Sequence, residues 1–384
     1  MPADGGDLPA VAHMVEHVLT HLENHRARFS TISSNSSPSS SAAPPPLFVG
    51  AQGPQGSGKT YLTSRLREAL GKKGVRAVVM SLDDLYLTHE GLVQVAGGNL
   101  DGSERTGNVL LKGRGLPGTH DVQLGTEVLG ALKEINGAVG VDGEGSFNKQ
   151  GRTIELPSFE KSLFEGEGDR LPRGEGKGTV VSAPPTVDVV VLEGWCVGFY
   201  PVSDECLKRR WTGAKQAEGG GGGGWEEGLT ESDKASVRGL MGVCEMAGVR
   251  MEDVEEVNEK LKAYVDWWQM LDMFLQIKPP EHSPYAIIYK WRLQQEHNMK
   301  SRNGGKGMSD EQVKRFVDRY IPGYVFFGDG VTKGLEADVK AEEGKCDNEA
   351  SVQGALTARR PSWIGRGLVI TIGEEREVLG VDSF

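Results

Sequence analysis

The sequence predicts an α/β fold in which a mostly parallel β-sheet is covered by helices on both faces. Three apolar segments carry this prediction, at residues 47–52, 75–82 and 187–192. Continuous apolar runs without polar alternation are typical of strands that are buried on both faces. Because segments with helical spacing lie between them, we expect the strands to run parallel, with ligand-binding groups at their carboxyl ends.

The region before the first predicted strand is expected to be a helix followed by a linker. Residues 8–29 have apolar positions at helical spacing and a polar opposite face. Residues 30–46 are rich in Ser and Pro, a composition typical of flexible linkers. We therefore expect an N-terminal helix with its linker at 1–46 and one large domain at 47–384.

A glycine-rich turn follows the first predicted strand and precedes a helical segment at 61–70. The turn matches G-x-x-x-x-G-K-[ST], a pattern in which backbone N–H groups and the positive end of the next helix cradle the phosphates of a nucleotide. Lys59 is expected to reach the β- and γ-phosphates, and the Thr60 hydroxyl to ligate Mg²⁺. The motif therefore predicts a P-loop NTPase fold that binds a nucleoside triphosphate. The expected phosphate-binding residues are Gly53, Pro54, Gln55, Gly56, Ser57, Gly58, Lys59 and Thr60.

Carboxylates follow the second and third predicted strands, at the same edge of the expected sheet as the glycine-rich turn. Asp83 could accept the proton of a substrate hydroxyl as it attacks the γ-phosphate, or hold Mg²⁺ through water. Asp84 is either the N-cap of a helix that starts at Leu85 or the alternative base. Glu193 is either a carboxylate that positions Mg²⁺ or water, or a solvated loop residue.

Two further segments place charged groups and an imidazole near predicted strand ends. A second glycine-rich turn, G-R-G-L-P-G-T-H-D, carries Arg114, His120 and Asp121 just before a helix. As structure alone, Asp121 could cap that helix and His120 could be a surface group. Lys161 and Arg170 follow a short predicted strand, where they either neutralise an anionic substrate or are merely solvated.

The carboxyl-terminal part is expected to contain helices and a final strand. A long helix with an aromatic stripe is predicted over 251–276, and another helix begins in a capping box at Ser309. Between them, Arg292 lies on a predicted helix or lid at 285–300. There it could stabilise charge on the transferred phosphate, or simply belong to an amphipathic helix. A closing strand is predicted at 368–372.

Composition limits the possible partners and compartments. The net charge of −11 and the pI near 5.4 argue against a nucleic-acid-binding surface. No apolar run is long enough for a membrane helix, and the 4 scattered cysteines predict reduced thiols. We therefore expect a cytoplasmic, or also nuclear, protein with no membrane partner. The 54 glycines are concentrated in runs, which predicts low-complexity insertions near 137–150, 212–230 and 333–360.

Several motifs occur together along the chain in a fixed order. A first set consists of Ser81-x-Asp83-Asp84-x-Tyr86, Pro157-x-Phe159-Glu160 and Leu192-Glu193-Gly194. A second set consists of Gly118-Thr119-His120-Asp121, Lys161-Ser162, Glu193-Gly194-Trp195, Lys290-Trp291-Arg292-Leu293-Gln294 and Met308-Ser309-Asp310-Glu311-Gln312-Val313. In its first set of motifs, the chain resembles the phosphoribulokinase and uridine kinase branch of P-loop kinases. In its second set of motifs, the chain is similar to D-glycerate 3-kinase of the plant type and its fungal ATP-dependent kinase relatives.

The resemblance implies a kinase that uses ATP and Mg²⁺ and transfers the γ-phosphate to a hydroxyl of a small molecule, with D-glycerate as the implied acceptor. It implies that Asp83 is the base and that Thr60 and Glu193 surround Mg²⁺. It also implies that Lys59 and Arg292 act on the phosphates. The residues implied near the acceptor are Arg114, His120, Asp121 and Lys161.

The acceptor has alternatives. Where the family has Tyr-Asp, this chain has Phe159 and Glu160. A nucleoside or a pantothenate-like alcohol is therefore the alternative acceptor, and a non-catalytic ATP-binding regulator is the alternative from another class. A GTPase is disfavoured, because no N-K-x-D guanine motif occurs and the third strand ends in Glu-Gly.

Overall fold

The computed structural model describes residues 8–34, 43–97, 107–137, 151–218, 244, 247–281, 285–302, 304–305, 307–334 and 361–384. Most of the expected linker and insertions, at 35–42, 138–150, 219–230 and 335–360, lies outside the described residues. Helix α5, Asp204–Glu218, extends into the second expected insertion, so residues 212–218 are helical.

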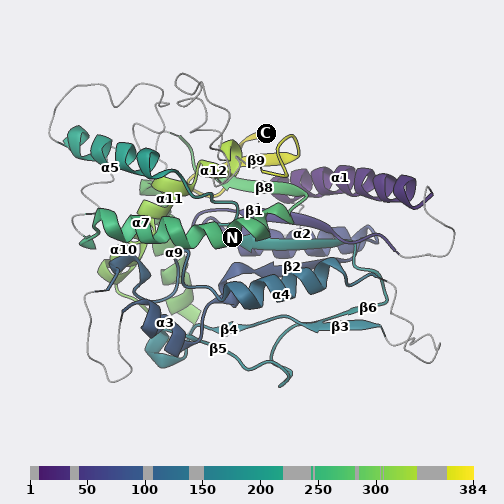
Figure 1. Cartoon of the computed structure of the whole chain (residues 1–384), viewed down its shortest axis with the longest axis horizontal. Helices are drawn as coiled ribbons and strands as arrows, with labels where there is room; N and C mark the ends of the chain where they lie inside the picture. Colours follow the sequence, from purple (N-terminus) through teal and green to yellow (C-terminus); the bar gives the residue numbers. More distant parts are fainter. Residues whose placement is uncertain are drawn as a thin grey trace, which may run out of the picture.

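A six-stranded sheet forms the centre of the molecule, with the strand order β10-β9-β8-β1-β7-β2 (Figure 1). Five neighbouring strands run parallel, and β10 is antiparallel to β9 at one edge. All six residues of β1 and all six of β7 are buried, as expected for strands covered on both faces. The strands are β1 Leu47–Gln52, β2 Ala77–Ser81, β7 Val189–Gly194, β8 Met273–Lys278, β9 Gly367–Ile372 and β10 Val378–Ser383.

The chain connections put helices on both faces of this sheet (Figure 1). The chain passes from β1 to β2 through α2, Lys59–Lys72, and returns from β2 to β7 through the segment that contains α4, Val122–Lys133. Crossovers between parallel strands are right-handed, so connections that move across the sheet in opposite directions cover opposite faces. The predicted α/β fold is therefore confirmed, and the carboxyl ends of β1, β2 and β7 share one edge.

The N-terminal helix is part of the main core. Helix α1, Pro9–Ser34, extends beyond the expected 8–29 and packs on α2 and β9. Its apolar side chains, including Val18 at 0% exposure, belong to the same hydrophobic cluster as the central strands. Arg26 also pairs with Asp188, the residue before β7. We therefore expect α1 to stabilise the large domain by burial of apolar surface.

The long helix predicted over 251–276 is wrong, because this segment ends in a central strand. The structure has α7 at Met251–Leu261, followed by the short helical turns η4 at Lys262–Tyr264 and α8 at Val265–Gln269. The strand β8 then lies beside β1. A short apolar run fits a buried helix or a buried strand equally well by periodicity, and no Gly or Pro marks the change here. The aromatic side chains of this segment are buried in the core, and they are Tyr264, Trp267, Trp268 and Phe274.

The remaining elements lie outside the six-stranded sheet. They include two short antiparallel pairs, β3 with β6 and β4 with β5. The capping box at Ser309 is confirmed at the start of α10. Among the described residues, no helix has the length and apolar character to cross a bilayer. The elements are η1 Leu82–Leu85, α3 His89–Val95, η2 Val109–Leu111, β3 Arg152–Glu155, β4 Phe159–Glu160, η3 Phe164–Gly166, β5 Asp169–Arg170, β6 Val180–Ala183, η4 Lys262–Tyr264, α8 Val265–Gln269, α9 Ala286–Arg302, α10 Asp310–Asp318, α11 Ile321–Phe327 and α12 Gly330–Lys333.

Candidate active site

The glycine-rich turn between β1 and α2 has the geometry of a phosphate-binding loop. Gly56 and Gly58 have φ angles of 74° and 87°, a region that glycine adopts readily and other residues rarely do. A Cβ atom at Gly56 would lie 2.6 Å from the carbonyl carbon of Trp291, so α9 closes directly over the turn. Lys59 and Thr60 are the first two residues of α2, at the positive end of that helix.

Two side chains from distant elements hold the phosphate-binding loop in place. Arg376 Nε donates to the Gly56 carbonyl oxygen at 2.9 Å, and the Gln55 N–H donates to the Tyr324 hydroxyl at 3.1 Å. Arg376 lies in the β9–β10 turn and also donates to Gln294 Oε1 on α9 at 2.8 Å. Sequence reasoning missed both contacts, because both residues reach the loop from the far end of the chain and no local pattern marks them.

Glu193 lies beside Thr60, and one of its two carboxylate oxygens has no hydrogen-bond partner among the described residues. Thr60 Oγ1 donates to Glu193 Oε1 at 3.0 Å, and Glu193 is 1% exposed. Within the described part of the chain, the buried Glu193 Oε2 has no hydrogen-bond partner, and neither has Ser57 Oγ. A buried carboxylate oxygen without a partner is unfavourable unless a ligand or ion engages it. Its place next to a threonine hydroxyl and the phosphate loop fits Mg²⁺.

The rest of a magnesium shell would have to come from nucleotide and water. No group of three or more His, Cys, Asp or Glu side chains suited to a metal occurs in the regions that the structure describes. Mg²⁺ usually takes one or two carboxylates together with phosphate oxygens and water. The pairing of Thr60 with Glu193 therefore suits a metal that arrives with the nucleotide.

Asp83 lies in η1 directly after β2, and both of its carboxylate oxygens are engaged. Lys161 Nζ donates to Asp83 Oδ2 at 2.5 Å, and the Tyr86 hydroxyl donates to Asp83 Oδ1 at 3.1 Å. Burial disfavours the charged form, but the Lys161 and Lys59 ammonium groups outweigh it and lower the pKa of Asp83 below its usual range. Asp83 is therefore ionised at neutral pH, as a general base must be.

Asp84 has a structural role, and its expected capping role is wrong. The N-cap of η1 is Ser81, because the helical turn begins at Leu82 rather than at Leu85. Asp84 Oδ1 instead accepts a hydrogen bond from the Phe159 N–H at 3.1 Å, which ties η1 to β4. Burial, reinforced by the neighbouring Asp83 charge, raises the pKa of Asp84 to about 6.

Lys161 lies on the turn between β4 and β5, and Arg114 supports that turn. Arg114 Nη1 donates to the carbonyl oxygens of Gly166 at 2.7 Å and Glu167 at 2.5 Å. Lys161 is thus placed next to Asp83, whereas Arg114 contacts the turn that carries Lys161. Of these two predicted acceptor residues, Lys161 is the one that the structure brings to the candidate base.

Asp121 and Arg170 bind one another at the start of α4. The capping alternative for Asp121 is confirmed, because Asp121 Oδ1 accepts from the Leu124 N–H at 3.0 Å. Asp121 Oδ2 accepts from Arg170 Nη1 at 2.6 Å. This pair joins the β4–β5 hairpin to α4 and so helps to fix the turn that carries Lys161.

His120 is buried, so the surface alternative for this residue is wrong. Its side chain is 3% exposed, and its ring stacks on Tyr86 with 4.5 Å between centroids. The Nδ1 atom lies 2.8 Å from the Tyr264 hydroxyl. Tyr86 therefore links His120 to Asp83. The S-x-D-D-x-Y motif pointed to Tyr86, whereas no sequence motif pointed to Tyr264 as a neighbour of His120.

Arg292 lies close to the phosphate loop by its backbone, while its guanidinium binds elsewhere. A Cβ atom at Gly56 would lie 2.7 Å from the Arg292 nitrogen. Arg292 Nη2 pairs with Glu296 Oε2 at 2.8 Å, and the guanidinium lies over the Phe316 ring. Arg292 would have to leave Glu296 to reach a phosphate, so its action there stays a prediction.

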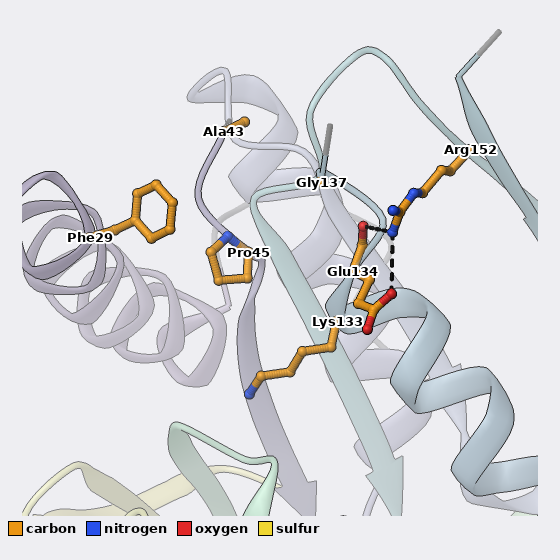
Figure 2. A pocket seen from close by; sticks show the side chains of 7 residues that line it. All are labelled: Phe29, Ala43, Pro45, Lys133, Glu134, Gly137 and Arg152. Atoms are coloured by element: carbon orange, nitrogen blue, oxygen red, sulfur yellow. Dashed lines mark hydrogen bonds and ion pairs between the residues drawn. The ribbon is translucent and has the colours of Figure 1, made fainter. Parts of the chain in front are cut away.

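A cavity of about 250 Å³ lies at the opposite edge of the sheet, near the start of β1 (Figure 2). Its charged side chains bind protein groups, since Arg152 pairs with Glu134 and Lys133 Nζ donates to the Met270 carbonyl oxygen at 3.1 Å. The cavity is thus separate from the carboxyl edge where the candidate site lies. It is lined by Phe29, Ala43, Pro45, Lys133, Glu134, Gly137 and Arg152.

Comparisons with known proteins find kinases among the proteins that are similar to this chain. No family model matches the chain. The uncharacterized kinase mug58 of Schizosaccharomyces pombe is 35% identical over 73% of this chain and 81% of that protein. The probable ATP-dependent kinase TDA10 of Saccharomyces cerevisiae is 34% identical over 73% of this chain and 78% of that protein. A solved structure of D-glycerate 3-kinase from Cryptococcus neoformans is 33% identical and has a TM-score of 0.70, covering 97% of this chain and 99% of that one.

Proposed function

We infer the function of this chain from its family and its candidate site. The chain belongs to the family of P-loop kinases that contains D-glycerate 3-kinase and the fungal ATP-dependent kinases. It is an ATP-dependent kinase that acts on a small molecule. The identity of that small molecule is the part that needs a proposal.

We propose that the acceptor is D-glycerate. The observation that carries this proposal is the contact between Lys161 Nζ and Asp83 Oδ2 at 2.5 Å. The contact puts an ammonium group beside the candidate base, in a protein whose net charge is −11. A small carboxylate needs such a local cation, because the protein as a whole repels it. A neutral nucleoside would have no use for this cation, whereas pantothenate also carries a carboxylate and is distinguished from D-glycerate by the assay below.

The proposed mechanism assigns one task to each residue. The Asp83 carboxylate accepts the proton of the acceptor hydroxyl as the hydroxyl oxygen attacks the γ-phosphorus. Lys161 moves from Asp83 to the acceptor carboxylate and orients the acceptor. Lys59 neutralises charge on the β- and γ-phosphate oxygens as the bond to the ADP oxygen breaks. Thr60 and Glu193 would hold Mg²⁺, which when bound supplies further charge neutralisation on the phosphates.

A coupled assay for ADP release tests the proposal directly. The assay compares D-glycerate, uridine, pantothenate and no added acceptor, each at saturating ATP and Mg²⁺. We expect rapid ADP release with D-glycerate and little with the other two acceptors. Turnover of uridine or pantothenate without turnover of D-glycerate would reject the acceptor and leave the kinase assignment intact. ADP release that no acceptor increases, together with tight ATP binding, would favour the regulator alternative.

A further inference from the structure

His120 carries a buried polar atom that the contacts described above leave unused. Its ring is 3% exposed, and its Nε2 atom is buried without a hydrogen-bond partner among the described residues. The other ring nitrogen, Nδ1, is 2.8 Å from the Tyr264 hydroxyl. Leaving a buried donor or acceptor unsatisfied is unfavourable, so a second partner is expected for this imidazole.

The surroundings of Tyr264 determine which nitrogen of His120 carries the proton. The Tyr264 hydroxyl accepts a hydrogen bond from the Gly118 N–H at 2.8 Å, and its own hydrogen is free to point at His120 Nδ1. If Nδ1 carried the proton instead, both the Tyr264 hydrogen and the Nε2 lone pair would lack partners. The tautomer with the proton on Nε2 leaves a single unsatisfied group and is therefore favoured.

Burial also keeps this imidazole neutral. Burial lowers the pKa of His120 to about 3, although the Asp83 carboxylate nearby acts in the opposite direction. At physiological pH His120 thus offers one N–H group and no charge. Because this N–H cannot gain or lose its proton near neutrality, its hydrogen bond should be independent of pH between about 6 and 9.

The stacking of His120 on Tyr86 places the imidazole ring near the candidate base Asp83. His120 stacks on Tyr86 at 4.5 Å between centroids with an angle of 20°, and the Tyr86 hydroxyl donates to Asp83 Oδ1 at 3.1 Å. The backbone supports this arrangement, because the Leu87 N–H donates to the Thr119 carbonyl oxygen at 3.0 Å and the Asp121 N–H donates to the Leu85 carbonyl oxygen at 2.8 Å. The segment that carries His120 is thus fixed alongside η1.

We propose that the Nε2–H group of His120 donates a hydrogen bond to an oxygen atom of the small-molecule substrate that receives the phosphate. This bond helps to determine which substrates the enzyme phosphorylates. This inference rests on the proposed kinase function, and it adds a neutral donor to the cation that Lys161 supplies. Tyr264 acts through His120 as a positioning residue, since its hydroxyl hydrogen fixes the tautomer. A site built to donate to an oxygen rejects analogues that lack it, because the buried N–H is then left unpaired.

The test compares three histidine variants by steady-state kinetics with D-glycerate. His120→Phe keeps the stacking on Tyr86 and removes the donor, whereas His120→Gln keeps an amide N–H near the position of Nε2. His25→Phe is the matched control, because His25 lies on α1 and hydrogen-bonds the Pro45 carbonyl oxygen far from the site. Circular dichroism and ATP affinity are measured for each variant to verify folding.

We expect His120→Phe to raise the KM for D-glycerate by about 10-fold or more, with the affinity for ATP unchanged. His120→Gln should recover most of the lost affinity, and His25→Phe should behave as the wild type. An unchanged KM in a folded His120→Phe variant would overturn the inference. So would a loss in His120→Gln that equals or exceeds the loss in His120→Phe, because a merely structural stacking role would favour Phe.

Two further measurements identify the bond and separate this inference from the proposed function. If the bond goes to the 2-hydroxyl of glycerate, the loss in His120→Phe disappears with 3-hydroxypropanoate; if it goes to the carboxylate, the loss persists. If the wild type does not phosphorylate D-glycerate, the proposed acceptor fails. The His120→Phe comparison is then made on the acceptor that the wild type does use, and an unchanged KM there rejects the inference.

The tautomer gives a readout that does not depend on turnover. Nitrogen NMR of labelled histidine should show His120 neutral, with its proton on Nε2 from pH 6 to 9, and the Nε2 signal should shift when the acceptor is added. Tyr264→Phe should allow the proton to move to Nδ1 and raise the KM. A proton on Nδ1 in the wild type would contradict the proposal.

Discussion

The candidate site has an expected phosphate half, with Ser57, Thr60 and Glu193, and a proposed acceptor half, with Asp83 and Lys161. The two halves differ in how many of their polar atoms are already paired with other protein groups. In the phosphate half, the buried Ser57 Oγ and Glu193 Oε2 atoms have no partner within the described residues. In the acceptor half, Lys161 pairs with Asp83 and Arg170 pairs with Asp121. We call the phosphate half open, and we call the acceptor half closed because its charged side chains pair with one another, although the neutral His120 Nε2 atom there has no partner among the described residues.

The two halves should therefore bind their ligands differently. Phosphates can enter a loop whose donors are already oriented, so little must rearrange before they bind. An acceptor has to replace the contact between Lys161 and Asp83, so it is bound only if it offers Lys161 an equivalent anion. The acceptor half is expected to decide specificity, and the phosphate half to provide most of the nucleotide affinity.

The largest effect is expected from Lys59→Ala, which removes the flexible cation of the open half. A single cation on the transferred phosphoryl group is worth about 10³–10⁵ in rate, so turnover should fall by that order and ATP should bind more weakly. The coupled ADP assay and ATP titration measure both quantities. Lys72→Ala, in the last turn of the same helix, is the control. Near-normal turnover in Lys59→Ala would contradict the nucleotide site.

Asp83→Asn should separate binding from chemistry. The amide cannot accept the hydroxyl proton, and loss of a general base typically costs about 10²–10⁴ in rate, whereas ATP affinity should be nearly unchanged. Asp84→Asn serves as the matched variant, because the amide oxygen of the new side chain can still accept the Phe159 N–H. If only Asp84→Asn lost activity, the base would have been assigned to the wrong carboxylate.

Lys161→Met tests whether the closed half selects an anionic acceptor. We expect the KM for D-glycerate to rise by about 10-fold or more, because the charge-assisted bond is lost. The removal of Lys161 should also raise the pKa of Asp83, so the acidic limb of the pH–rate profile should move to higher pH. Lys177→Met, an exposed lysine paired with Glu175, is the control. An unchanged KM and profile would show that Lys161 does not contact the acceptor.

The smallest expected effect concerns stability, and it has opposite signs at the two neighbouring carboxylates. The pKa of Asp84 is raised to about 6 in the folded state, so the fold binds its proton more tightly than the unfolded chain does, and stability falls as pH rises from about 4 through 6. The pKa of Asp83 is lowered, so Asp83 adds stability above its unfolded pKa and loses it as pH falls.

Chemical denaturation at pH 5 and pH 8 can measure this difference. Asp84→Asn should gain roughly 1 kcal/mol relative to the wild type at pH 8, and less at pH 5, because the neutral amide avoids the cost of a buried charge. An equal effect at both pH values would mean that Asp84 is not perturbed in the fold.

Neighbouring residues were enough to predict the parts of this protein whose geometry is local. Eight consecutive residues between an apolar segment and a helical one predicted the phosphate loop, because a loop of this kind binds phosphates mainly through its own backbone. Asp83 and Glu193 could be predicted at its side, because the carboxyl ends of parallel strands share one edge of the sheet. The motif order also sufficed to predict the family.

Contacts between distant segments complete these parts, and no sequence pattern predicted them. The strand β8 was hidden in an apolar run that fits a helix equally well, and its identity follows from pairing with β1. Tyr324 and Arg376 reach the phosphate loop from the far end of the chain. The pairing of Lys161 with Asp83 and the unused nitrogen of His120 likewise depend on which distant groups meet. Spacing along a chain reports local geometry, whereas charge pairing and burial depend on contacts that form only when the chain has folded.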